Sequence, residues 1–190
     1  MLFSYNRMQT LLKNMDQKFP IGKISIVGAP ATGKTTLSKM IRGELINYKY
    51  NPTMGFSLGT LSDPKENPFK IWDFGGQKAF LAQQLSKYIH GSDLIFIVTD
   101  STPKNVLATM EIIDHARNLI DDDLCEIVCL ANKQDLKGHM TPDRVEELLK
   151  IKTYPMVAID PSNKRLMIEL ISTLMRYTQK KIKILTEQGK

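Results

Sequence analysis

A phosphate-binding pattern occupies the segment from Gly28 to Thr35. The residues read Gly-Ala-Pro-Ala-Thr-Gly-Lys-Thr, which fits the pattern G-x-x-x-x-G-K-[ST]. In a loop of this kind, backbone N–H groups and the positive end of the following helix surround phosphate oxygens, and the lysine reaches the β- and γ-phosphates. We therefore expect a nucleotide phosphate chain to be bound through Gly28, Ala31, Thr32, Gly33, Lys34, Thr35 and Thr36.

Pro30 is an unusual residue inside this loop. It has no N–H, so its position cannot donate a hydrogen bond to a phosphate, and its ring fixes φ near −65°. The flanking amides remain available, so we expect phosphate binding to survive. The fit of an arginine offered to the γ-phosphate by a partner protein is expected to change.

The tetrapeptide Asn132-Lys133-Gln134-Asp135 indicates which base the nucleotide carries. The Asp135 carboxylate can accept hydrogen bonds from both the N1–H and the exocyclic amine of guanine, an arrangement that adenine cannot match. Lys133 is expected to lie along the base, and Asn132 to tie neighbouring segments together. A phosphate loop alone does not separate ATPases, kinases and GTPases, but this tetrapeptide after an apolar run, roughly 100 residues downstream, favours guanine.

Further positions have the chemistry needed for Mg²⁺ binding and hydrolysis. Asp73 ends an apolar run and is placed to hold Mg²⁺ directly or through water, while Thr53 offers a hydroxyl ligand beside that of Thr35. The amide of Gly76 can meet a γ-phosphate, and Gln77 would orient the attacking water. The candidate magnesium ligands are thus Thr35, Thr53 and Asp73, and the candidate catalytic residues are Gln77, Lys34 and Thr53.

Short apolar runs alternate along the chain with segments of helical spacing. This alternation predicts a parallel sheet covered by helices on both faces, and such sheets bind ligands at the carboxyl ends of their strands. Most of the motifs above directly follow an apolar run, so the sheet would bring them to one edge. The predicted strands are 23–28, 69–74, 93–99, 126–131 and 156–159.

Three helix starts are marked by a capping residue followed by proline. The capping oxygen satisfies a free backbone N–H, and proline at the first helical position loses a donor that had no partner. These pairs predict where helices begin and have no expected role in binding or catalysis. They are Thr102-Pro103, Thr141-Pro142 and Asp160-Pro161, the last opening a final core helix predicted from Pro161 to Leu185.

With these motifs in this order, the chain resembles the Ras-like small GTPases and, within them, the Arf/Sar/Arf-like family. The resemblance covers about residues 20–178. It implies an α/β P-loop NTPase fold in a domain spanning 20–190, with a doubly wound, mostly parallel six-stranded sheet and helices on both faces. It also implies that the amide of Ala158 meets the base oxygen, although the residues around Ala158 match the family less closely. The most specific segments are Pro52–Phe56, Trp72–Gln77 and Asn132–Leu136.

The resemblance implies a switch between GTP and GDP that uses Mg²⁺. Two loops, near 47–56 and 74–90, would order around the γ-phosphate and be released on hydrolysis. Intrinsic hydrolysis should be slow because no arginine finger is evident in the chain, so an activating protein and an exchange factor are expected partners. The hairpin Met54–Phe74, with its turn at 62–68, would slide and couple the nucleotide to the N-terminal segment.

Residues 1–19 form a predicted amphipathic helix. The resemblance implies that such a helix docks in the GDP state and enters the membrane interface in the GTP state, which makes residues 1–17 the peripheral membrane contact of a cytoplasmic protein. Permanent packing of the helix on the core is the alternative. Residue 2 is Leu, so the family's N-myristoylation signal is absent. The apolar stripe consists of Leu2, Tyr5, Met8, Leu12, Met15 and Phe19.

The net charge of +6 lies at the two ends of the chain. Residues 1–50 hold 8 basic and 2 acidic side chains, residues 176–190 hold 5 and 1, and the part between them is mildly acidic. No basic stripe with interleaved aromatic residues is present, so no nucleic-acid partner is expected. The basic C-terminal segment is expected to be a solvated helix end, with anionic-lipid binding as the alternative. No apolar run approaches the length needed to cross a bilayer.

The two cysteines and three histidines carry no predicted chemistry. On a strand, Cys125 and Cys129 would stand about 13 Å apart, too far for a disulfide, so we expect buried, reduced thiols. The histidines are scattered and have no metal-ligand spacing. At 190 residues the chain is expected to form one folded domain and a monomer.

Three functions are compatible with these residues to different degrees. The favoured one is a GTP-hydrolysing switch in nucleotide-dependent membrane recruitment or trafficking. A GTP-binding scaffold with negligible hydrolysis is left open by Pro30 and opposed by Gln77 and Thr53. An adenine-nucleotide kinase or ATPase is disfavoured by the Asn132–Asp135 tetrapeptide.

Overall fold

The computed structural model describes residues 22–46, 52–53, 55–61, 69–120 and 124–187. The predicted N-terminal helix over 1–19 and the predicted turn at 62–68 lie outside these ranges. In the part of the chain that is described, no helix is long and apolar enough to cross a membrane.

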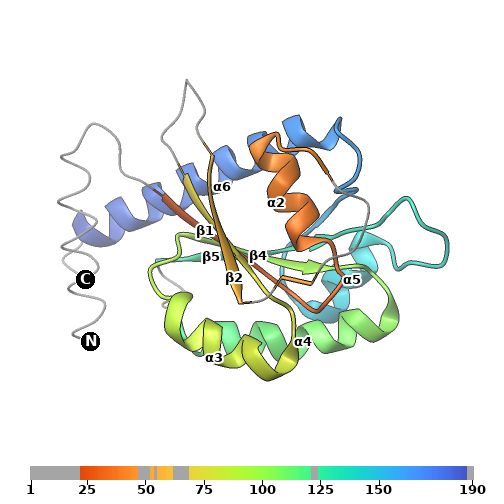
Figure 1. The fold of residues 1–190 in the computed structure, drawn as a ribbon. Coiled ribbons are helices and arrows are strands. Elements are labelled where there is room, and N and C mark those ends of the chain that lie inside the picture. The colour runs from red at the N-terminus through yellow and green to blue at the C-terminus, as the bar shows by residue number, and fades with distance from the viewer. Residues whose placement is uncertain (1–21, 47–51, 54, 62–68, 121–123, 188–190) are drawn as a thin grey trace.

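A six-stranded sheet in the order β2-β3-β1-β4-β5-β6 forms the centre of the molecule (Figure 1). All neighbouring pairs are parallel except β2 and β3, which are antiparallel. The doubly wound, mostly parallel six-stranded sheet expected from the sequence is therefore confirmed. The strands are β1 Gly22–Val27, β2 Phe56–Leu61, β3 Phe69–Phe74, β4 Leu94–Thr99, β5 Glu126–Ala131 and β6 Thr153–Pro155.

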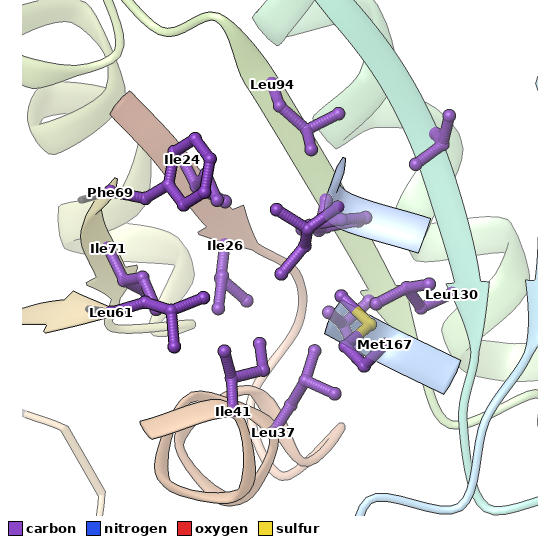
Figure 2. Packing of buried hydrophobic residues seen from close by; sticks show 14 of the residues in the cluster. Ile24, Ile26, Leu37, Ile41, Leu61, Phe69, Ile71, Leu94, Leu130 and Met167 are labelled. Atoms are coloured by element: carbon purple, nitrogen blue, oxygen red, sulfur yellow. The ribbon is translucent and has the colours of Figure 1, made fainter. Parts of the chain in front are cut away.

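Helices cover both faces of the sheet and divide the core into two layers. The strand residues alternate between the layers: Phe96 of β4 packs with α2 and α6, whereas Ile95 and Ile97 pack with α3, α4 and α5. Figure 2 shows the first layer, in which Leu37 of α2 and Met167 of α6 meet the strand side chains. The helices are α2 Lys34–Arg42, α3 Lys78–Tyr88, α4 Pro103–Arg117, α5 Pro142–Leu149 and α6 Asn163–Glu187.

Two of the three predicted helix starts are confirmed in detail. The hydroxyl of Thr102 accepts a hydrogen bond from the N–H of Asn105, and that of Thr141 accepts one from Arg144, both at 3.4 Å. The third prediction places the start of α6 two residues too early. A turn intervenes, in which the Asp160 carboxylate accepts the N–H of Ser162 at 2.9 Å, and the helix begins at Asn163.

The predicted strand at 156–159 is wrong, because β6 ends at Pro155. The N–H of Met156 still donates to the carbonyl of Ala131 at 2.9 Å, but the chain then turns away from the sheet. That turn lets the N–H of Ala158 donate to the side-chain oxygen of Asn132 at 3.0 Å. Met156 and Ala158 are buried as loop residues, so their alternation imitates a strand.

Both cysteines are buried and free, as predicted. Cys129 lies within β5 and Cys125 immediately precedes that strand. Burial raises the pKa of the Cys129 thiol to about 12, against a small opposing effect of the Thr153 hydroxyl. At neutral pH, Cys129 is therefore a protonated, inert core side chain.

Candidate nucleotide-binding site

A cavity of about 390 Å³ opens at the carboxyl edge of the sheet. This is the size of a small-molecule site, and the carboxyl edge is where open α/β sheets bind ligands. Most of the predicted site residues come together in its wall, together with Pro30. They are Ala31, Gly33, Lys34, Thr35, Thr36, Thr53, Gly76, Gln77, Asn132, Lys133, Asp135 and Ala158.

Glycines at two loop positions are required by close approach of other groups. A Cβ on Gly28 would lie 2.2 Å from the carbonyl oxygen of Val98, and one on Gly33 would lie 2.3 Å from the side-chain nitrogen of Asn132. Gly33 also has φ 97°, a conformation that L side chains rarely adopt. Gly28 and the fully buried Thr32 do not line the cavity; they shape the loop from behind it.

Lys34 is almost completely buried at the start of α2. Its ammonium donates to the carbonyl of Ala29 at 2.7 Å, across the turn of the loop. Burial lowers the pKa of Lys34 to about 8, although the nearby Asp73 carboxylate acts in the opposite direction. A phosphate anion beside Lys34 would favour the charged lysine, so the loop is suited to an anionic ligand.

The three candidate magnesium ligands lie in one hydrogen-bonded group, although they come from three separate segments. The Thr35 hydroxyl donates to Oδ2 of Asp73 at 2.6 Å and lies 2.8 Å from the hydroxyl of Thr53. Thr35 lies in the first turn of α2, Asp73 is the next-to-last residue of β3, and Thr53 belongs to the segment before β2. Asp73 is buried behind the cavity wall, beneath the two threonines.

The chemistry of this group fits Mg²⁺. Hydroxyl and carboxylate oxygens are hard ligands, and protein Mg²⁺ sites commonly combine one or two carboxylates with substrate phosphates. The second carboxylate oxygen of Asp73, Oδ1, is buried and has no hydrogen-bond partner among the described residues. Burial raises the pKa of Asp73, opposed by the hydrogen bond from Thr35 and by the Lys34 ammonium. A divalent cation would use the free oxygen and favour the ionised carboxylate.

Gly75 and Gly76 bring the end of β3 against the phosphate loop. The N–H of Gly75 donates to the carbonyl of Gly55 at 2.7 Å. A Cβ on Gly76 would lie 2.6 Å from the backbone nitrogen of Pro30, so this segment rests on the Ala29–Pro30 peptide. Gln77, which follows, lines the cavity and immediately precedes α3.

Asn132 connects the two ends of the cavity. Its side-chain nitrogen donates to the carbonyl of Thr32 at 2.8 Å, and its side-chain oxygen accepts the N–H of Ala158 at 3.0 Å. Its own N–H donates to the carbonyl of Thr99 at 2.8 Å. Through its side chain and its backbone N–H, this one buried residue thus holds the phosphate loop, the Ala158 turn and the end of β4 in a fixed arrangement.

Lys133 and Asp135 extend from this anchor toward the cavity. Lys133 has φ 64°, and its ammonium lies 3.8 Å from the carboxylate of Asp100. Burial would raise the pKa of Asp100, but hydrogen bonds from Thr102 and Asn105 and the Lys133 charge outweigh it and lower the pKa. The Asp135 side chain is exposed at the cavity wall, where it is free to meet a base edge.

Two supporting residues were not predicted from the sequence. The Ser101 hydroxyl donates to the carbonyl of Asn132 at 2.9 Å, and the Gln134 amide donates to Ser101 at 2.8 Å and to the carbonyl of Met140 at 3.1 Å. These contacts fix the loop that carries Asp135. A short polar run, Asp100-Ser101-Thr102, directly after the apolar strand β4 is the sequence signal that could have found Ser101.

Comparison with known proteins agrees with this geometry. Residues 8–187 match the sequence profile of the ADP-ribosylation factor family. The chain belongs to the ADP-ribosylation factor (Arf) family. It is 32% identical over 146 residues to ADP-ribosylation factor-like protein 2 of Dictyostelium discoideum, a match that covers 75% of this chain and 77% of the relative.

Other Arf-family relatives show the same level of similarity. ADP-ribosylation factor-like protein 5 of Caenorhabditis elegans is 33% identical over 153 residues, covering 77% of this chain and 83% of that protein. ADP-ribosylation factor-like protein 2 of Drosophila melanogaster is 31% identical over 147 residues, with 75% and 77% covered. The Arf-family chain described here is thus an Arf-like, P-loop, GTP-binding small GTPase, which confirms the family expected from its motifs.

Proposed function

We propose that this Arf-family protein is a Mg²⁺-dependent switch that hydrolyses GTP slowly and is recruited to membranes in its GTP state. The observation that carries the proposal is the group formed by Thr35, Thr53 and Asp73, in a cavity also lined by Lys34 and Gln77. These residues come from three segments of the chain, namely the start of α2, the segment before β2 and the end of β3 with the residues that follow it. Their convergence supports a site for a metal-bound triphosphate more than an ordinary phosphate-binding loop.

In the proposed reaction, water attacks the γ-phosphorus of GTP, and the bond from that phosphorus to the β–γ bridging oxygen breaks. GDP and inorganic phosphate are released. Gln77 orients the water, and Lys34 holds the β- and γ-phosphate oxygens. Mg²⁺ held by Thr35, Thr53 and Asp73 would neutralise charge on those oxygens.

The residues that line the cavity support a slow intrinsic rate of GTP hydrolysis. Among the described residues the cavity wall contains lysines but no arginine. A partner arginine can raise the rate of such a reaction by about 10³–10⁵-fold. We therefore propose an activating protein and an exchange factor as partners of a monomer that does not bind nucleic acid.

The guanine end of the proposed site depends on Asn132, Lys133, Asp135 and Ala158. Asp135 would accept the two donors of the guanine edge, and the amide of Ala158 would meet the base oxygen. In the structure, the N–H of Ala158 donates to the side-chain oxygen of Asn132. Contact with the base would therefore require the amide to share its hydrogen between two acceptors or to turn toward the cavity.

Single-turnover hydrolysis tests the enzymatic part of the proposal. Wild-type protein loaded with GTP and Mg²⁺ should release phosphate in one slow phase, and Gln77→Leu should abolish that release while retaining bound GTP. Wild-type release no faster than that of Gln77→Leu would overturn the proposed hydrolysis and leave a GTP-binding scaffold.

Vesicle co-sedimentation tests membrane recruitment. Protein comprising residues 1–190 should sediment with anionic vesicles when loaded with a non-hydrolysable GTP analogue and remain in the supernatant with GDP. Protein lacking residues 1–17 should remain in the supernatant in both states. Partitioning that is independent of the nucleotide would contradict a switch in membrane binding.

A further inference from the structure

Lys39 lines the cavity but has no part in the site described so far. The other two lysines of the wall are engaged, since Lys34 donates to Ala29 and Lys133 lies beside Asp100. Lys39 is half-buried. Within the described ranges, no hydrogen bond or ion pair joins its ammonium to another residue. Among the residues that the structure describes, no anionic side chain neutralises this cation of the wall.

The helical position of Lys39 directs its side chain toward the phosphate loop. Lys39 lies in α2, four residues after Thr35 and three after Thr36, so the three side chains share one face of the helix. Side chains on a helix tilt toward its N-terminus. The Lys39 stem therefore runs back over the turn that carries Thr35 and Thr36, and all three residues line the cavity.

The neighbours of Lys39 indicate which part of a nucleotide it can reach. Its Cα lies about 7.5 Å farther along α2 than that of Lys34, at 1.5 Å per residue. It is thereby set apart from the start of α2, where Lys34 and Thr35 face the proposed β- and γ-phosphates. It is closest in sequence to Thr36, whose position is predicted to bind phosphate.

We propose that the Lys39 ammonium donates a charge-assisted hydrogen bond to the α-phosphate, the phosphate nearest the ribose in both GDP and GTP. The inference rests on the proposed nucleotide site and adds a residue that holds the nucleotide in both states of the switch. Such a contact slows nucleotide release equally before and after hydrolysis. It thereby sets how strongly the protein depends on an exchange factor.

The test compares Lys39→Met with wild type in the full-length chain, using GDP and GTPγS with Mg²⁺. Loss of a hydrogen bond between charged groups should weaken binding of both nucleotides by the same factor, about tenfold, through faster dissociation. Lys39→Arg should stay within about threefold of wild type because it retains a cationic donor. Lys180→Met removes an exposed lysine of α6 instead and should change neither constant.

Three results would overturn the inference. Unchanged affinities in Lys39→Met would show that Lys39 makes no contact, and a loss confined to GTPγS would place it at the γ-phosphate. A decrease confined to the association rate constant and abolished by added salt would show that Lys39 attracts the nucleotide only at long range. Lys39→Gln repeats the test if the methionine variant does not fold. Failure of wild type to bind guanine nucleotides would instead overturn the proposed function itself.

Discussion

The phosphate end and the base end of the cavity are built in different ways. The phosphate end is built around one continuous loop, whose shape depends on Gly28 and Gly33, where no side chain fits. That loop carries the buried Lys34, and the buried Asp73 of β3 and the hydroxyl of Thr53 complete this end of the cavity. The base end is assembled from separate loops by hydrogen bonds centred on Asn132. If the cavity binds a nucleotide as proposed, phosphate binding would depend mainly on the geometry of one loop, whereas base recognition would depend on a polar network between distant segments.

The largest expected effect is a change of base preference in Asp135→Asn. An amide in place of the carboxylate should reject guanine and accept xanthine, because a site built around specific hydrogen bonds discriminates strongly against a mismatched partner. We expect the ratio of GDP to XDP affinity to fall by about 10³-fold or more, measured by calorimetry.

Asp143→Asn is the matched control, because Asp143 is exposed on α5. It should leave the GDP to XDP ratio unchanged. If Asp135→Asn did not bind XDP more tightly relative to GDP than wild type does, Asp135 would have no role in base recognition.

Asn132→Ala should affect both ends of the cavity, because its side chain joins them. The carbonyl of Thr32 and the N–H of Ala158 would lose their partners, at about 1–3 kcal/mol for each buried group. We therefore expect the free energy of unfolding in urea to fall by about 2–4 kcal/mol. Asn118→Ala, at the exposed end of α4, should change it by less than about 0.5 kcal/mol. Equal stabilities of the two variants would show that the ends are built independently.

Lys34→Met should damage the phosphate end alone. Removal of a charged donor to phosphate should weaken GDP binding by about 10–100-fold. The ratio of GDP to XDP affinity should stay at the wild-type value, because the base end keeps its hydrogen bonds. A changed ratio would contradict the separation of the two ends, and competition binding measures both quantities.

The smallest expected effect concerns Cys129, which reports on the strand that leads to the base end. The thiolate is the reactive form, and its pKa of about 12 lies well above the usual 9.0. In a Cys125→Ala background, alkylation at pH 8 should be negligible in the native state and rapid in urea. Between pH 8 and 10 the native rate should keep rising, whereas that of an exposed thiol levels off above its pKa. Rapid native alkylation at pH 8 would show that β5 opens readily.

Features with a local cause could be predicted from the sequence. Short-range patterns were enough to predict the phosphate loop, the helix caps at Thr102 and Thr141, and the four strands β1, β3, β4 and β5. Thr53 was predicted as a second hydroxyl ligand beside Thr35, 18 residues away, only because the other motifs follow in the required order. Alone, it would be an ordinary loop residue.

The features that could not be predicted from the sequence depend on contacts between residues far apart in the chain. After β6 the chain turns so that the N–H of Ala158 donates to Asn132, 26 residues away in sequence, and the apolar alternation at 156–159 does not indicate this contact. Likewise, Ser101 meets Gln134 across 33 residues. Such contacts exist only once the sheet has brought β4, β5 and β6 side by side.

A preference of the cavity for guanine nucleotides bound with Mg²⁺ is the central property expected of this protein. Calorimetric titration of nucleotide-free protein with GDP and with ADP, each in Mg²⁺ and in EDTA, measures that preference. We predict that GDP binds at least about 10³-fold more tightly than ADP and that EDTA weakens GDP binding. Equal affinities for GDP and ADP, or GDP binding unaffected by EDTA, would contradict the account.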